Sequence, residues 1–290
     1  MTYHITHRTL YEYAAPVSVS HHVTRLEPRA TKAQTCERFS LKIFPEPTLR
    51  KSHQDYFGNR LCFFAVQESH SKLEIITNSR VTVSANAILP STQTVAWEQV
   101  AALFRDPVSP QVVEQYQYVF DSPQVRVSLE LADYARQSFT PGIPILAGVA
   151  DLTLRIYKDF KYDPTATTVA TPLEEVWEKR RGVCQDFAHL GIALLRSLGL
   201  PARYVSGYLR TRPPAGKPRL VGADASHAWF SIFAPGIGWV DFDPTNNCQP
   251  KEEHITVAFG RDFGDVSPVA GILTGGGAHR IKVSVDVAEA

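Results

Sequence analysis

The chain has 290 residues, a formal net charge of +1, and 44% hydrophobic and 20% charged residues, as in an ordinary globular protein that can bury a core unaided. No basic block interleaved with aromatic residues indicates a nucleic-acid partner, and the four scattered cysteines exclude a zinc ribbon or a disulfide scaffold. No apolar run approaches the roughly 20 residues that span a bilayer, and no leader-like segment follows Met1. We therefore expect a cytoplasmic protein without a membrane partner.

The first third of the chain has the pattern of β-structure. Short β-branched or aromatic runs alternate with turn residues through residues 1–89, which predicts an N-terminal sandwich-like or barrel-like β domain. The stretch 85–94 is the expected linker to a second domain over residues 95–290, which includes the C-terminal strands. The expected N-terminal strands are Thr9–Tyr13, Phe39–Phe44, Arg60–Val66, Leu73–Thr77 and Arg80–Ser84.

Helical periodicity then replaces alternation. Apolar residues recur at helical spacing around residues 129–139 and 143–160. Thr171 is the expected N-cap of a further short helix, with Pro172 at its first position and Glu174 completing a capping box.

The strongest expected helix follows Gly182 and ends at Gly199, with one continuous apolar face from Phe187 to Leu198. Strands are expected after it at residues 202–210, 225–233 and 238–242. The loop 211–222 is rich in proline and glycine and is expected to be mobile, and residues 281–287 alternate as a final strand. Helices followed by adjacent strands predict an α+β fold.

Cys184 stands at the start of that strongest helix. A thiol there faces the positive end of the helix dipole and unpaired backbone N–H groups, which favour the reactive thiolate. The same amides could stabilise an oxyanion on an attacked carbonyl. The apolar face begins only at Phe187, so Cys184 need not be a core residue. A buried structural cysteine is the alternative, and a nucleophile would need partners.

His227 is the best candidate for a base among the ten histidines. Strand alternation places His227 and Trp229 on the face opposite the core-facing residues, which suits an active-site cleft, although a structural histidine can show the same pattern. Six other histidines fall in the N-terminal β region. His189 lies on the Cys184 helix and points away, and His254 and His279 lie in the tail.

An acid that fixes the imidazole orientation is expected on the next strand. Asp243 ends that strand, before Pro244 and Thr245, where it could lie beside His227. Asp241 has the same parity and competes with it, and an Asp-Pro pair could simply begin a turn.

Three segments together resemble the signature blocks of the transglutaminase-like superfamily, namely residues 181–188, 226–229 and 243–245. The likeness is to microbial members, which are often described as candidate cysteine proteases. Residues 7–13, 26–29 and 55–59 are similar to the β-rich region that precedes such domains in bacteria.

The resemblance implies a papain-like, transglutaminase-like α+β core in which a nucleophile helix packs on an antiparallel sheet. It implies that Cys184 is the nucleophile, His227 the base and Asp243 the orienting acid. Asp243 is favoured over Asp241 because the aspartate of the family is followed by Pro-Thr. Animal relatives use calcium, but no EF-hand loop, HExxH motif or cysteine pair is present, so we expect no metal and no cofactor.

The expected reaction is attack of the Cys184 thiolate on an amide carbonyl of a protein or peptide substrate, at a peptide bond or a glutamine side chain. Water would resolve the thioester in a protease or amidase, and an amine would resolve it in a transamidase; we favour hydrolysis. Tyr162 and Gln185 are candidate oxyanion donors, and Trp177 is expected in the core. Cys248 is a redox neighbour of the site or an incidental thiol.

Two other functions stay open. Arylamine N-acetyltransferases share the order of cysteine, histidine and aspartate, and they work from acetyl-coenzyme A, which would acetylate Cys184. A catalytically silent protein-binding scaffold could also use this fold, although all three positions hold competent residues.

Overall fold

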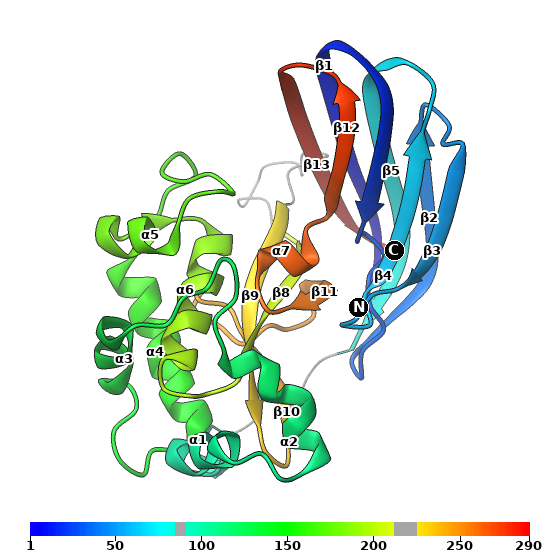
Figure 1. Ribbon diagram of the computed structural model, residues 1–290. Coiled ribbons are helices and arrows are strands. Elements are labelled where there is room, and N and C mark those ends of the chain that lie inside the picture. The colour runs from blue at the N-terminus through cyan, green and yellow to red at the C-terminus, as the bar shows by residue number, and fades with distance from the viewer. Residues whose placement is uncertain (85–90, 212–224) are drawn as a thin grey trace, which may run out of the picture.

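The computed structural model describes residues 1–84, 91–211 and 225–290. The expected mobile loop and most of the expected linker lie outside these residues. The fold is α+β, as predicted, and is arranged in three layers: helices, a four-stranded sheet, and a larger sheet that contains the N-terminus (Figure 1). No helix in the described ranges is long and apolar enough to cross a membrane, and the expected cytoplasmic location stays a prediction.

The larger sheet has seven strands, all paired antiparallel, and β1 lies at its centre. The first half of β1 pairs with β5 on one side and β13 on the other, and its second half pairs with β4 and β12. Its strands are β1 (Thr2–Thr24), β2 (Gln34–Phe44), β3 (Leu49–Gln54), β4 (Arg60–Val66), β5 (His70–Val83), β12 (Val269–Gly275) and β13 (His279–Glu289).

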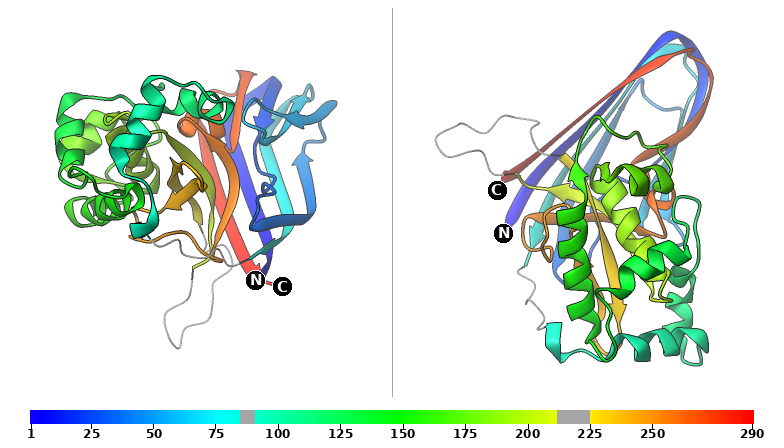
Figure 2. Two further views of the ribbon diagram at one scale, coloured as in Figure 1. Left: turned by 90° about the horizontal axis from the view of Figure 1, so that it is seen from below. Right: turned by 90° about the vertical axis from the view of Figure 1, so that its left-hand side faces the viewer.

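The C-terminal strands therefore pair with the N-terminal sheet. Sequence analysis grouped them with residues 95–290, whereas β13 runs alongside β1 from Tyr3↔Glu289 to Tyr13↔His279. The alternation seen at residues 281–287 predicts a strand but contains no signal for its partner. The two chain ends consequently lie side by side (Figure 2), and the backbone N–H of Ala290 donates to the carbonyl of Thr2.

The smaller sheet is antiparallel, with the order β10-β9-β8-β11. Helix α6 packs on its β8 and β9 strands, and a Cβ on Gly191 would lie 2.5 Å from the ring of Phe230, so only glycine permits this approach. The strands are β8 (Ala202–Leu209), β9 (Ala225–Ala234), β10 (Gly238–Phe242) and β11 (His254–Gly260).

Helices cover the face of the smaller sheet that lies away from β1 (Figure 1). The α-helices are α1 (Trp97–Arg105), α2 (Pro110–Gln115), α3 (Leu129–Arg136), α4 (Ile145–Asp159), α5 (Leu173–Lys179), α6 (Cys184–Arg196) and α7 (Phe263–Val266). Short 3₁₀ helices occupy Ser91–Gln93 and Tyr116–Val119, and β6 (Lys161–Tyr162) pairs in parallel with β7 (Arg181–Gly182).

Helix α5 begins one residue later than expected. Its N-cap is Pro172, whose side chain forms no capping hydrogen bond, and not Thr171. The hydroxyl of Thr171 instead accepts a hydrogen bond from the backbone N–H of Thr168, which closes the preceding turn. The expected capping box was therefore wrong, because the threonine found a nearer backbone donor.

The two sheets share one hydrophobic core and several buried hydrogen bonds. His7 Nδ1 lies 3.0 Å from the Tyr208 hydroxyl, and the amide of Gln34 both donates to and accepts from the backbone of Thr256. Asn59 makes the same two-way contact with the backbone of Phe259. These bonds fix the N-terminal sheet against β8 and β11, on the face of the smaller sheet that the helices leave open.

Candidate active site

Cys184 is the first residue of α6, and its side chain is partly buried. The preceding segment, β7, pairs with β6 in the register Tyr162↔Gly182, so a short two-stranded connection holds the start of the helix. This position places the thiol beside the unpaired backbone N–H groups of the first helical turn, as the sequence predicts.

Gly182 and Asp186 fix the entry of the chain into α6. Asp186 Oδ2 accepts the backbone N–H of Val183 at 2.8 Å and the hydroxyl of Thr167 at 2.6 Å. A Cβ on Gly182 would lie 2.6 Å from that same carboxylate oxygen. Because a Cβ cannot approach so closely, glycine is needed two residues before Cys184 for the carboxylate to cap the helix.

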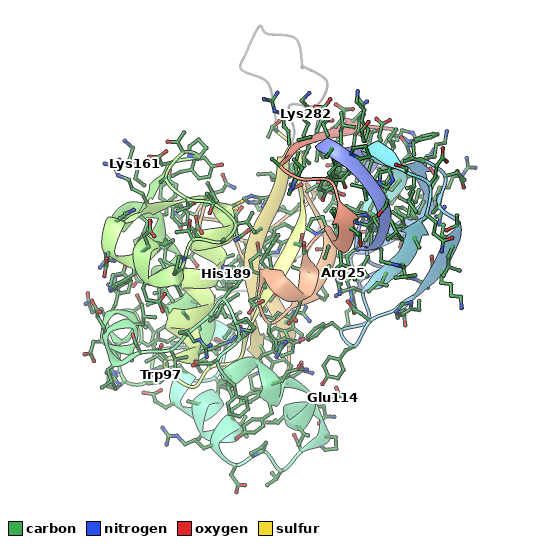
Figure 3. The ribbon with its side chains drawn as sticks, turned by 45° about the horizontal axis from the view of Figure 1, so that its top comes forward. Arg25, Trp97, Glu114, Lys161, His189 and Lys282 are labelled. Carbon is green, nitrogen blue, oxygen red and sulfur yellow. The ribbon has the colours of Figure 1, made fainter. Side chains whose placement is uncertain are left out.

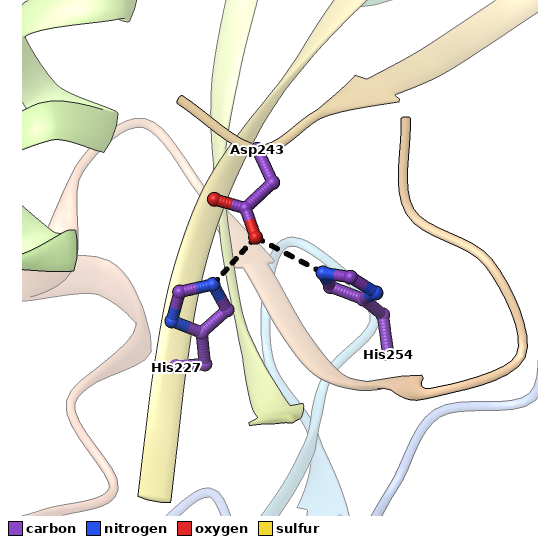
Figure 4. A group of neighbouring side chains, drawn as sticks. All are labelled: His227, Asp243 and His254. Carbon is purple, nitrogen blue, oxygen red and sulfur yellow. Dashed lines mark hydrogen bonds and ion pairs between the residues drawn. The ribbon is translucent and has the colours of Figure 1, made fainter. Parts of the chain in front are cut away.

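His227 and Asp243 are in direct contact. His227 Nε2 lies 2.7 Å from Asp243 Oδ2, and both side chains are buried (Figure 4). Because Nε2 is taken by the carboxylate, Nδ1 is the ring nitrogen left for the Cys184 thiol, which lies close enough to His227 to raise its pKa. The structure thus brings together the three residues that sequence analysis selected.

Charge favours a protonated imidazole. Burial alone lowers the pKa of His227, but the hydrogen bond to Asp243 and the interaction with the neighbouring Cys184 outweigh it and raise the pKa to about 10. Burial also acts to raise the pKa of the Asp243 carboxyl, but the hydrogen bonds from His227 and His254 overcome it and hold this pKa well below its usual range. An imidazolium beside a thiol stabilises the thiolate, which is the nucleophilic form.

The carboxylate of Asp243 is fully used. Its Oδ1 accepts the backbone N–H groups of Thr245 and Asn246, so the Asp-Pro-Thr-Asn turn itself orients the side chain. Its Oδ2 also accepts the Asn246 amide at 2.7 Å. Asp243 therefore both begins a turn and binds His227, so the two interpretations considered for it do not exclude each other.

Sequence analysis missed His254, which was set aside with the tail. Its Nε2 lies 3.0 Å from Asp243 Oδ2, the oxygen that also binds His227 (Figure 4). His254 is the first residue of β11, a strand that sequence analysis did not expect. The only local signal was alternation after residue 254, and it could not show which residue the strand would face.

Asp241 lies on the same face of β10 but serves a different group. Its Oδ2 accepts the indole N–H of Trp229 at 3.0 Å, and its Oδ1 accepts the Ser231 hydroxyl. Asp241 thus anchors the tryptophan next to His227, and its two oxygens are used by Trp229 and Ser231.

The other candidate residues are distributed around Cys184. Burial, and then the charge of Cys184, raises the pKa of Tyr162, so its hydroxyl lies within electrostatic reach of the thiol. The Gln185 amide instead donates to the carbonyl of Val169 at 3.3 Å. Trp177 packs against the core, as expected.

Cys248 and His189 belong to the surroundings of the site. Cys248 pairs its backbone with Asp243, and burial and the nearby carboxylate raise the pKa of its thiol to about 11. His189, at the centre of Figure 3, accepts the backbone N–H of Phe263 at 3.0 Å, and burial lowers its pKa to about 4. Both observations agree with structural roles.

One cluster offers ligands of the kind that bind a metal. His227, Asp243 and His254 present one ligand atom each, and these atoms all lie within 4.8 Å of one another. Both imidazoles direct Nε2 to the same carboxylate oxygen, so a cation there would have to replace two hydrogen bonds. The expectation of no metal stays a prediction.

Two family profiles match the chain. The profile described as "Bacterial transglutaminase-like N-terminal region" matches residues 3–82, and the profile described as "Transglutaminase-like superfamily" matches residues 132–244. The second span includes all three predicted catalytic residues.

Relatives extend the match to nearly the whole chain. The uncharacterized protein Rv2569c of Mycobacterium tuberculosis is 39% identical over 290 residues, which cover 98% of this chain and 92% of its own. A protein-glutamine gamma-glutamyltransferase of Pseudomonas aeruginosa is 30% identical over 129 residues, 42% of this chain and 18% of the relative. A crystal structure from Cytophaga hutchinsonii, described as a candidate cysteine protease, matches with a TM-score of 0.76 at 23% identity, over 99% of this chain and 90% of that one.

Proposed function

Because the chain belongs to the transglutaminase-like superfamily, we propose that it is an acyl-transfer enzyme that attacks amides of proteins or peptides with the Cys184 thiolate. The observation that carries this proposal is the placement of His227 between the Cys184 thiol and the buried Asp243 carboxylate. The carboxylate holds the imidazole by Nε2 and keeps it protonated, as the third member of a triad does.

The reaction has two steps. The Cys184 Sγ attacks the amide carbonyl carbon, and the tetrahedral oxyanion collapses as His227 gives its proton to the leaving nitrogen, so that the C–N bond breaks and a thioester remains. Water then attacks the thioester while His227 takes one of its protons. A carboxylic acid leaves, and Cys184 is regenerated.

The oxyanion needs donors beside Cys184. The backbone N–H of Cys184 at the start of α6 is one, and we assign the second to the Tyr162 hydroxyl. Tyr162 is half exposed, on a strand held in register with the segment before Cys184, and its hydroxyl interacts with the thiol charge. The competing candidate, Gln185, already donates its amide to Val169.

Transamidation is the second candidate for the fate of the thioester. The partial match to a protein-glutamine gamma-glutamyltransferase favours it, whereas our proposal is hydrolysis. A blocked glutaminyl-glycine peptide separates the two. Release of ammonia with formation of the glutamate product indicates hydrolysis, and incorporation of an added primary amine into the product indicates transamidation.

The first test of the proposal is labelling with limiting iodoacetamide from about pH 5 to about pH 9, followed by intact mass measurement and peptide mapping. Wild type is compared with His227→Ala and Cys184→Ser. We expect fast labelling of Cys184 at low pH that slows when His227 is removed. Cys36 is an internal reference, since burial raises the pKa of its thiol to about 11.

Other outcomes separate the alternatives. Labelling of Cys184 no faster than that of Cys36, and unaffected by the His227→Ala change, would overturn the enzyme proposal in favour of a protein-binding scaffold. Acetylation of Cys184 by acetyl-coenzyme A would instead favour the N-acetyltransferase function.

A further inference from the structure

A second site lies on the face of the smaller sheet that packs against the N-terminal part. A cavity of about 580 Å³ lies between strands β8, β10 and β11 and the segment that follows β1. Among its lining residues are Arg29, Arg203, Trp229, Trp239 and His254. Cys184, His227 and Asp243 are not among them, and His254, which contacts Asp243, is the lining residue that joins the cavity to the candidate active site.

The unusual feature of this cavity is Arg203, whose guanidinium group lacks a polar partner among the described residues. Its guanidinium carbon lies 4.2 Å from the ring centre of Trp239 and 3.6 Å from that of Phe259, so two aromatic rings hold it in place. None of its nitrogens has a hydrogen-bond or ion-pair partner in the part of the chain that the structure describes, and its Nε is buried. Buried guanidinium N–H groups are normally paired, because an unpaired charge is costly to bury.

The nearby acid does not pair with Arg203. Asp241 is the acidic residue that lines the cavity, and its two oxygens are taken by Trp229 and Ser231. Burial lowers the pKa of Arg203 to about 10, and Asp241 offsets part of this effect, so the guanidinium stays charged at neutral pH.

The other charged residues of the lining are also mainly positive. Arg29, Lys32 and Lys251 also line the cavity, so its cationic side chains outnumber the single acid. His254 is a buried lining residue, and its Nδ1 has no partner among the described residues. Trp239, which is partly exposed, supplies a flat apolar wall beside these polar groups, and the fully buried Trp229 lies behind the lining.

We propose that this cavity binds a small molecule that carries a carboxylate on an aromatic or otherwise flat body. The carboxylate accepts two parallel hydrogen bonds from the Arg203 guanidinium, whose planar fork matches it. The body of the molecule packs against Trp239. A site of this volume, with apolar walls and a few convergent polar groups, is typical of small-molecule binding.

Benzoate tests this proposal, and benzamide is its uncharged counterpart of the same shape. Binding to the full-length protein is measured by isothermal titration calorimetry and by tryptophan fluorescence, which Trp239 makes sensitive to the cavity. We expect saturable binding of benzoate in the millimolar range, weakened by about tenfold or more in Arg203→Met and much less in the matched exposed control Arg280→Met. Benzamide should bind about tenfold more weakly than benzoate.

Folding of the variants is checked by thermal unfolding. Arg203→Met removes an unpaired buried charge and keeps the aliphatic stem, so its melting temperature should equal or exceed that of the wild type. Arg203→Lys keeps the charge without the fork and should show intermediate affinity. Absence of saturable benzoate binding to wild type, or equal affinity for benzoate and benzamide, would overturn the proposal without reference to any variant.

Discussion

The carboxylate of Asp243 is shared with a second imidazole: Nε2 of His254 lies 3.0 Å from Asp243 Oδ2, and both residues are buried. The hydrogen bond from His254 contributes to holding the Asp243 pKa low. A carboxylate that receives donors from two sides has little freedom to rotate. His254 therefore positions the Asp243 carboxylate, which in turn holds the His227 imidazole.

Replacing His254 tests this positioning role. His254→Phe removes the donor and keeps a ring, and kcat/KM on a glutaminyl peptide should fall about tenfold, since a hydrogen bond to a charged group contributes about 1.5–3 kcal/mol. The pH dependence of Cys184 labelling should shift with it, which a merely structural change would not cause. His254→Gln, which restores a donor, should recover part of the loss, and the exposed His53→Phe is the matched control. An unchanged pH profile in His254→Phe argues against the role.

The raised pKa of His227 makes a prediction about stability. The folded-state pKa is about 10, above the unfolded value of about 6.5, so the protonated imidazole stabilises the fold. This contribution is fully present below about pH 6.5 and is lost as the pH rises through about 10. Urea unfolding of wild type and His227→Gln should therefore show a stability difference that shrinks between these values. A difference that is constant or grows with pH would contradict the assignment.

Removal of the Tyr162 hydroxyl should slow the chemical step. In Tyr162→Phe we expect kcat to fall about a hundredfold with little change in KM, because the donor acts on the oxyanion and not on the ground-state substrate. The half-exposed Tyr157 on α4 provides the control, Tyr157→Phe. If turnover is unchanged in Tyr162→Phe, another group supplies the second donor.

A methyl group at position 182 should displace the start of α6 and with it Cys184. In Gly182→Ala the new Cβ would lie 2.6 Å from Asp186 Oδ2, so the carboxylate has to leave the Val183 amide and the start of α6 has to move. We expect a loss of about 1–3 kcal/mol of stability by urea unfolding. The rate of Cys184 labelling should also fall in the protein that remains folded. If Gly182→Ala keeps the stability and the Cys184 labelling rate of the wild type, the close approach of Gly182 to Asp186 is unimportant.

Removal of the last two strands should affect the sheet at the other end of the chain. A chain that stops before residue 269 lacks β12 and β13, and one edge of β1 then has no partner over both of its halves. We expect this truncation to accumulate as aggregate, since an unpaired edge strand recruits other chains. The soluble fraction after expression measures the effect. A truncated chain that stays soluble, with a native circular dichroism spectrum, would show that β1 does not need β12 and β13.

Local sequence signals predicted the elements that carry Cys184, His227 and Asp243. The strand alternation around His227, the helix start at Cys184 and the strand before Asp243 each have a pattern within a few residues, and β10 matches its expected bounds. His254 has no such pattern. Its contact joins Asp243, at the end of β10, to β11, and the sheet order separates these strands by two others. The partner of the C-terminal strands was missed for the same reason, because pairing over long sequence distances is decided by the packed structure.

Because β1 pairs with β13, the larger sheet can be completed only after the C-terminal strand has been synthesised. During synthesis β1 emerges early, and the residues of the candidate active site are all made before the strand that closes its sheet. Until β13 arrives, Ile5, which is buried in the finished protein, lies on a strand with an open edge, in the core that also contains Tyr208 and Ile255. The nascent chain therefore contains Cys184 before its scaffold is whole. Ribosome-bound chains should depend on chaperones over this interval, and Cys184 should gain its activated character only after the last strand is released.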